Sequence, residues 1–228
     1  LPIFNFKELD ILLNNQIFQI IFFTIAVATV VNGQNIIDGT NGLSSFASLA
    51  IFTSILFLGF YLNDQDIINT SLLIIVLLIG FIAFNYPFGL IFLGDTGCYF
   101  LGFLSSYLVI DIFAKYPELP SWSAVIILFY PTLEACFSFF RKISFKNSPF
   151  QPDDKHLHLK IYFLISKEKK PRKLHNALVT PFLGIIWLSP LSLLPLSIQH
   201  THWSLLFLSV IVIVYLFFYY AIPEPSKN

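Results

Sequence analysis

The chain has 228 residues, of which 56% are hydrophobic and only 11% are charged. Because a soluble globular domain carries about 25% charged residues, this composition excludes an ordinary soluble enzyme and indicates a membrane protein. The net charge is zero, which gives no reason to expect a nucleic-acid partner. Cys98 and Cys136 both lie in apolar stretches, so we expect small core residues rather than a disulfide or a metal pair.

Seven stretches are long and apolar enough to span a membrane, which takes roughly 17–25 residues of helix. Their connections are short, except for one long, polar and basic loop at 141–176. The sequence therefore predicts an all-α polytopic membrane protein whose residues 1–228 form a single membrane-embedded domain. The predicted spans are 15–34, 43–62, 67–85, 92–113, 121–140, 177–197 and 203–222.

The basic residues are distributed unevenly between the two sides of these spans. Of the 13 Lys and Arg residues, only Lys7 and Lys115 fall on one side, and the others fall on the side of the long loop. The positive-inside rule makes that side cytoplasmic. Alternation of the spans then puts 32–42 and 85–95 on the same face. Because the chain starts at Leu1 without a basic segment and cleavage site, we expect no signal peptide and expect it to be N-terminally incomplete.

A first polar cluster follows the first span. Asn32, Asn35 and Asp38 are three residues apart, so on a helix they share one broad face. Gly39 and Gly42 follow and permit close approaches that a side chain would forbid. A helix end with a glycine stop explains these residues as well as a site does, until the rest of the chain is considered.

A second polar cluster covers 85–97, where Asp95 lies in the sequence Gly94-Asp95-Thr96-Gly97. Small neighbours let a carboxylate approach a phosphate or a hydrated metal ion closely. Magnesium prefers one or two protein carboxylates, with phosphates and waters in its other positions. Asp38 and Asp95 together therefore favour a diphosphate site. The alternative is an intramembrane acid that serves as an ion site in a secondary transporter.

The long loop carries a third cluster at 148–158, which contains His156 and His158. Two histidines in a charged loop are often only solvated, and the absence of a nearby cysteine argues against zinc. The loop's basic residues also serve as an orientation signal that attracts anionic headgroups. Glu134, deeper in the fifth span, is interpreted as a helix-packing acid.

At this point the motifs match a family. The chain resembles the polyprenyl-phosphate N-acetylhexosamine-1-phosphate transferases, relatives of the phospho-N-acetylmuramoyl-pentapeptide transferase, over what corresponds to their C-terminal two-thirds. Each motif is weak alone, but four in the same order are specific together. They are Asn32-x-x-Asn35-x-x-Asp38-Gly39-x-x-Gly42-Leu43, Asn85-x-Pro87, Phe92-Leu93-Gly94-Asp95-Thr96-Gly97, and Pro149-Phe150-x-Pro152-Asp153 followed by His156-Leu157-His158.

The resemblance implies roles for these residues. Asp95 matches the aspartate that ligates Mg²⁺ (or Mn²⁺), and Asp38 and His156 join it as catalytic residues. The implied substrate-binding residues are Asn32, Asn35, Gly39, Asn85, Phe92 and His158. The implied reaction transfers a sugar-1-phosphate from a UDP-N-acetylhexosamine to undecaprenyl phosphate, releases UMP and initiates a cell-surface or cell-wall glycan. We expect a multi-pass protein of the bacterial inner membrane, with its active site on the cytoplasmic face, its partners a UDP-sugar and a polyprenyl phosphate, and a homodimer as a further expectation.

Three departures from the family pattern stand out. The family's pair of adjacent aspartates belongs before Leu1, Asn41 stands where some relatives carry a second aspartate, and Leu159 replaces a third histidine. The first departure keeps open a catalytically inactive fragment or scaffold of the same family. The secondary transporter stays a second alternative, although we find no inverted repeats in the sequence.

Overall fold

The computed structural model describes residues 2–146, 148, 149, 151, 153–166 and 172–223 of the chain. These residues are helical, with no strand among them. Phe150 and Pro152 of the fourth motif lie outside the described residues, as do four of the basic residues counted above, Lys167, Lys169, Lys170 and Lys227. The helices are α1 (Lys7–Leu13), α2 (Gln16–Ile36), the short 3₁₀ turn η1 (Ile37–Gly39), α3 (Leu43–Leu62), α4 (Gln65–Asn85), α5 (Gly94–Lys115), α6 (Trp122–Ile127), α7 (Phe129–Ser144), α8 (Leu157–Ser166), α9 (Arg172–Phe182), α10 (Gly184–Trp187), α11 (Ser189–Ser197) and α12 (Thr201–Ala221).

Five helices are long and apolar enough to cross a membrane: α2 with η1, α3, α4, α5 and α12. A sixth span results if the bent pair Leu174–Phe182 and Gly184–Ser197, which meets at 46°, crosses as one element. The chain is thus an all-α multi-pass membrane protein, as predicted. The prediction of seven spans is corrected to five or six among the described residues.

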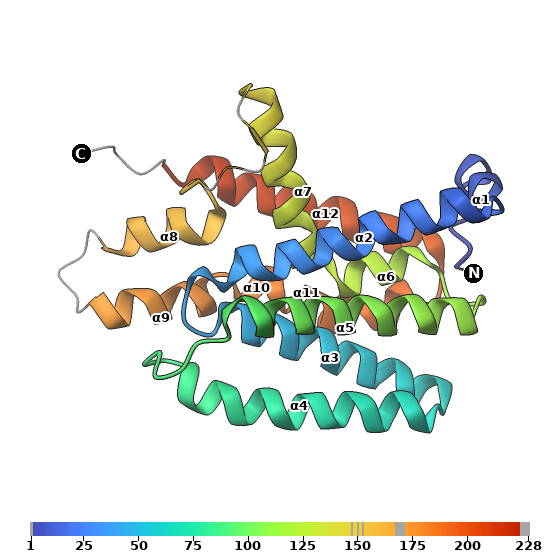
Figure 1. Cartoon of the computed structure of the whole chain (residues 1–228), viewed down its shortest axis with the longest axis horizontal. Helices are drawn as coiled ribbons and strands as arrows, with labels where there is room; N and C mark the ends of the chain where they lie inside the picture. Colours follow the sequence, from blue (N-terminus) through green and yellow to red (C-terminus); the bar gives the residue numbers. More distant parts are fainter. Residues whose placement is uncertain (1, 147, 150, 152, 167–171, 224–228) are drawn as a thin grey trace.

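The missing span is the predicted helix 121–140. The structure breaks it at Leu128 into α6 and α7, and neither half is long enough to span a membrane. Pro131 lies in the first turn of α7, where its missing N–H costs no helical hydrogen bond but where it cannot continue a helix from α6. The start of α7 packs against α2, and its far end projects beyond the other helices (Figure 1).

The predicted loop 141–176 is also more ordered than expected, because α8 lies inside it. Leu157 and Ile161 are four residues apart and fully buried, in one cluster with Val179 of α9 and Tyr215 of α12. Apolar residues at this spacing form one helix face. The loop therefore folds back onto the bundle instead of extending from it.

Helix α2 is central to the bundle and packs against α5 and α7. A Cβ atom built at Gly33 would lie 2.0 Å from the backbone oxygen of Pro131, so only glycine lets these two backbones come so close. The buried amide of Gln34 donates to the hydroxyls of Ser44 (2.7 Å) and Ser48 (2.8 Å), which joins α2 to α3. These contacts fix the position of α2 in the bundle and therefore the position of η1, which follows it.

At the opposite end of the bundle, Asp64 joins three segments. Its Oδ1 accepts from the backbone N–H groups of Asp66 (3.1 Å) and Ile67 (3.3 Å) and so caps α4. Its Oδ2 accepts from the Lys115 ammonium and from the Tyr116 hydroxyl. Hydrogen bonds from Lys115 and Tyr116 lower the pKa of Asp64 from 3.8 to about 2.

We expect Asp64→Asn to lower the stability by about 1 kcal/mol, because asparagine keeps the cap but loses the ion pair with the partly exposed Lys115. A lowered carboxyl pKa adds stability that is fully present above the unfolded pKa and lost as the pH falls through the folded one. Thermal unfolding of both proteins from pH 6 down to pH 2 should show the difference above about pH 4 and its loss near pH 2. A difference that does not change with pH would contradict the ion pair.

Candidate active site

The first two predicted clusters meet where α2 ends and α5 begins. The Asn35 amide of α2 donates to Oδ1 of Asp95 at 2.8 Å, although 60 residues separate them. Asp38 in η1 lies beside the Gly94 backbone and the side chains of Ser44 and Cys98, near enough to Asp95 for their charges to interact. Two carboxylates from distant segments therefore share one end of the bundle. Asp95 is exposed in the first turn of α5, so ligands can reach it.

Two asparagines hold the neighbouring loops in place. The Asn85 side chain accepts from the N–H of Gly42 and donates to the carbonyl of Ile91, both at 2.7 Å. The Asn41 side chain donates to the carbonyl of Pro87 at 2.9 Å. Asn85 was predicted to bind substrate; in the structure its oxygen and its nitrogen each have a partner within the protein, and its role toward a ligand stays a prediction.

Helix α9 is attached to the same loop. The backbone N–H of Asn41 donates to Oδ1 of Asn176, and the Thr180 hydroxyl donates to the carbonyl of Asn41 at 2.7 Å. Asn41, which stands where some relatives carry an aspartate, therefore joins three segments. An aspartate there has no N–H for the Pro87 carbonyl, so asparagine suits this junction.

The third cluster reaches the site through Gly39. A Cβ atom at Gly39 would lie 2.4 Å from Nε2 of His158, so the imidazole packs directly on η1. His158 is 1% exposed, and its Nδ1 has no hydrogen-bond partner among the described residues. Burial lowers the pKa of His158 to about 4; the Glu134 carboxylate opposes this shift and the charge of His156 adds to it. His158 is therefore neutral at pH 7.

His156 lies next to His158, with ring centroids 5.7 Å apart and nearly parallel planes. Its Nδ1 is 2.9 Å from Oε1 of Glu134, and its Nε2 is 3.6 Å from Oδ1 of Asp153. Arg141 holds Asp153 with two contacts of 2.9 and 3.0 Å. Burial acts to raise the pKa of Asp153, but the hydrogen bond from Arg141 prevails and lowers it.

Glu134, Arg141 and Tyr215 are the residues that sequence reasoning did not assign to the site. Glu134 was interpreted as a packing acid, yet its carboxylate accepts from His156 and from the Tyr215 hydroxyl. The one available signal was that a carboxylate in an apolar segment needs a partner. Nothing in the spacing showed which partner.

Two predicted binding residues form no hydrogen bond with the other predicted site residues in the part of the chain that the structure describes. Asn32 donates to the carbonyl of Ala28 in its own helix at 2.7 Å. Phe92 is 73% exposed. Their predicted roles in substrate binding stay predictions.

The donor set suits magnesium better than a metal with a full protein shell. Among the described residues, no group of three or more His, Cys, Asp or Glu side chains gathers as a metal cluster. Asp95 and Asp38 supply two carboxylates, which is the number that Mg²⁺ takes when phosphates and waters complete its shell. The residues present therefore fit this ion.

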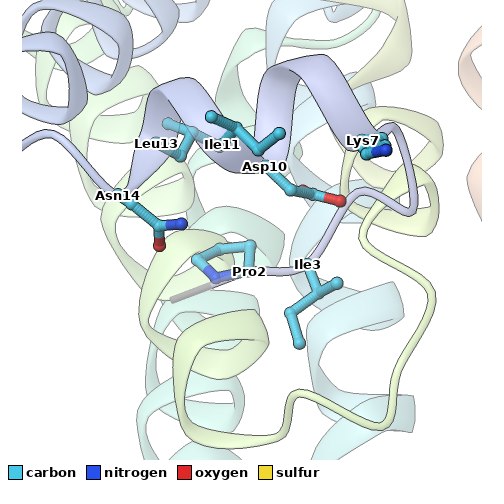
Figure 2. A pocket seen from close by; sticks show the side chains of 7 residues that line it. All are labelled: Pro2, Ile3, Lys7, Asp10, Ile11, Leu13 and Asn14. Atoms are coloured by element: carbon cyan, nitrogen blue, oxygen red, sulfur yellow. The ribbon is translucent and has the colours of Figure 1, made fainter.

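A hollow of about 450 Å³ lies far from these residues, at the opposite end of α2. It is lined by Pro2, Ile3, Lys7, Asp10, Ile11, Leu13 and Asn14 (Figure 2). Asp10 accepts from the backbone N–H groups of Phe4 (2.9 Å) and Phe6 (3.1 Å), so its carboxylate folds the first residues onto α1. This hollow does not belong to the candidate site.

Comparison with known proteins agrees with the motifs. The family model for glycosyl transferase family 4 matches residues 2–113. The undecaprenyl-phosphate alpha-N-acetylglucosaminyl 1-phosphate transferase of Thermotoga maritima is 31% identical over 138 residues, 60% of this chain and 41% of that protein. A probable undecaprenyl-phosphate N-acetylglucosaminyl 1-phosphate transferase of Bacillus subtilis is 30% identical over 58% of this chain and 37% of that protein.

A third relative is the phospho-N-acetylmuramoyl-pentapeptide-transferase of Dictyoglomus turgidum, 33% identical over 49% of this chain and 38% of that protein. The matches thus span about two fifths of the length of these relatives. No solved structure matches the chain significantly. The matched segment contains the two clusters that meet at Asp38 and Asp95. Residues 2–113 of this chain are therefore similar to glycosyl transferase family 4, and the relatives described above agree with that similarity.

Proposed function

We propose that this protein transfers N-acetylglucosamine-1-phosphate, or the 1-phosphate of a closely related N-acetylhexosamine together with its sugar, from a UDP-sugar to undecaprenyl phosphate. The observation that carries the proposal is the meeting of Asp38, Asn35 and Asp95 at one end of an apolar bundle. The names of the relatives from Thermotoga maritima and Bacillus subtilis supply the acceptor and the sugar. The product would be the lipid-linked sugar that begins a cell-surface or cell-wall glycan.

The reaction joins two polyanions. An oxygen of the lipid phosphate attacks the β-phosphorus of the UDP-sugar, a new P–O bond forms, and the bond from the β-phosphorus to the bridging oxygen breaks, so that UMP leaves with that oxygen. Mg²⁺ (or Mn²⁺), when bound, would neutralise charge on the diphosphate oxygens. Asp95 and Asp38 would hold the ion, and Asn35 would orient Asp95 through its 2.8 Å hydrogen bond.

His156 and His158 would act on the phosphates from the side opposite Asp38 and Asp95. His158 packs against Gly39 and brings α8 onto the loop that carries Asp38. His156 would offer its Nε2 to a phosphate oxygen, either to accept a proton or, once protonated, to donate a hydrogen bond. Fixed groups of this kind supply positioning and charge stabilisation, which are the main needs of phosphoryl transfer.

One substrate lies in the membrane and the other in water, and a site at the membrane boundary is accessible to both. An isoprenoid chain needs an apolar environment and a nucleotide sugar arrives from water, so they meet at a membrane boundary. The excess of basic residues near the site supports a cytoplasmic orientation at the bacterial inner membrane. The homodimer stays a prediction.

Release of UMP tests the proposal. Protein purified in detergent, given UDP-N-acetylglucosamine, undecaprenyl phosphate and Mg²⁺, should release UMP only when all three are present, and a chelator should stop the release until Mg²⁺ is restored. Binding of the UDP-sugar without UMP release would instead favour a scaffold. Ion-coupled flux into vesicles without UMP release would favour a transporter.

A further inference from the structure

Glu134 is a buried carboxylate whose two oxygens are both engaged. The residue is 1% exposed. Its Oε1 is 2.9 Å from Nδ1 of His156 and accepts a longer bond of 3.4 Å from the N–H of Leu157. Its Oε2 accepts from the Tyr215 hydroxyl at 2.9 Å. Three segments of the chain, α7, the start of α8 and α12, therefore meet at this carboxylate.

This arrangement decides which nitrogen of His156 carries a proton. A carboxylate accepts and does not donate, so the imidazole atom that faces it must be Nδ1–H. In the neutral ring the lone pair is then on Nε2. That atom points toward Asp153 at 3.6 Å, beyond hydrogen-bond distance, and Arg141 already binds both oxygens of Asp153.

Packing alone does not account for the choice of residue. Burying a carboxylate is costly unless it is fully hydrogen-bonded, and apolar residues of similar volume often stabilise as well or better. The network also runs from the interior toward the surface. Side-chain exposure rises from 1% at Glu134 to 10% at His156 and 22% at Asp153.

We infer that Glu134 is the positioning residue of His156, and that Tyr215 in turn orients Glu134. The pair fixes the Nδ1–H tautomer and leaves the lone pair on Nε2, the ring atom on the side of Asp153, for the reacting phosphates. Buried carboxylates hold imidazoles in this way in hydrolases and behind metal-binding histidines. The role of His156 at the reacting phosphates rests on the proposed function. The assignment of its tautomer does not.

The tautomer can be measured without turnover. In protein labelled with ¹⁵N-histidine, the His156 signal is identified by its loss in His156→Gln. We expect the neutral ring to be protonated at Nδ1 and unprotonated at Nε2. Glu134→Gln should shift the population toward the Nε2–H form, because the amide can donate to Nδ1. An unprotonated Nδ1 in the natural protein, or no change in Glu134→Gln, would overturn the inference.

Two buried tyrosines provide a matched comparison. Tyr215 donates to Glu134. The Tyr130 hydroxyl, on the same helix as Glu134, is buried and has no hydrogen-bond partner in the described part of the chain. Tyr215→Phe should therefore broaden or shift the His156 signal, and Tyr130→Phe should leave it unchanged. Equal effects from the two variants would indicate packing instead of orientation.

Activity provides the second arm. We expect Glu134→Gln to lower kcat about 10–100-fold with little change in KM for the UDP-sugar, and Glu134→Asp to restore part of the loss. The groups next to the His156 ring are Glu134, Asp153 and His158, and the two carboxylates are bound in turn by Tyr215 and Arg141. An unchanged kcat would overturn the role of Glu134 in the reaction. If the natural protein releases no UMP, the proposed function is refuted, and the tautomer measurement alone decides the role of Glu134.

Discussion

Asp95→Asn is expected to lower UMP release by about 10³-fold or more, because an amide lacks the charge that holds a divalent cation at the diphosphate. The variant keeps the shape of the side chain and an oxygen that can accept from Asn35, so the fold should persist. The rate is measured as UMP released at saturating UDP-sugar and lipid phosphate. Binding of Mn²⁺, followed by electron paramagnetic resonance, should weaken in parallel.

Asp111→Asn is the matched control for this experiment. Asp111 is also exposed on α5, but it lies near the opposite end of that helix from Asp95. The same chemical change there should leave UMP release and Mn²⁺ binding unaltered. Wild-type rates in Asp95→Asn would remove Asp95 from the site, and a loss in both variants would indicate general damage to α5.

Gly33→Ala should produce the largest loss of stability. The added Cβ atom would lie 2.0 Å from the backbone oxygen and 2.5 Å from the carbonyl carbon of Pro131. Because backbone atoms cannot move aside as a flexible side chain can, α2 and α7 must separate. We expect a cost of about 2–4 kcal/mol, which corresponds to a midpoint of thermal unfolding lower by roughly 5–15 °C.

Gly80→Ala tests whether the effect comes from crowding. Gly80 is in α4, and a Cβ atom there would meet nothing within 4 Å. The substitution should be neutral or raise the stability by up to about 1 kcal/mol, since alanine favours the helix. Both variants are compared with the natural protein by the fraction that stays monodisperse in detergent after heating. Equal midpoints for Gly33→Ala and the natural protein would show that α2 and α7 do not pack as described.

The local part of the site was predictable from the sequence. Asn35 and Asp38 follow one apolar run and Asp95 starts another, so counting spans put all three on one face. The structure brings them together, although their catalytic roles stay predictions. The count itself was wrong by at least one, because composition does not reveal that a helix bends away after Leu128.

The partners of the buried polar residues were not predictable. Glu134 binds Tyr215 across 81 positions and His156 across 22, and neither separation belongs to a helical repeat. The same is true of Asn41 with Asn176 and of Gly42 with Asn85. Which side chain meets which depends on how whole helices pack.

The sequence by itself determined five of the membrane spans and the end of the bundle to which each polar segment belongs. A run of about 20 apolar residues is a local property, and the thickness of the bilayer sets its length. Only the tertiary structure decided that α8 folds back onto the bundle, that the predicted span 121–140 breaks into α6 and α7, and that Glu134 faces His156. Those outcomes depend on shape and hydrogen bonding between residues far apart in the chain, and these leave no period in the sequence.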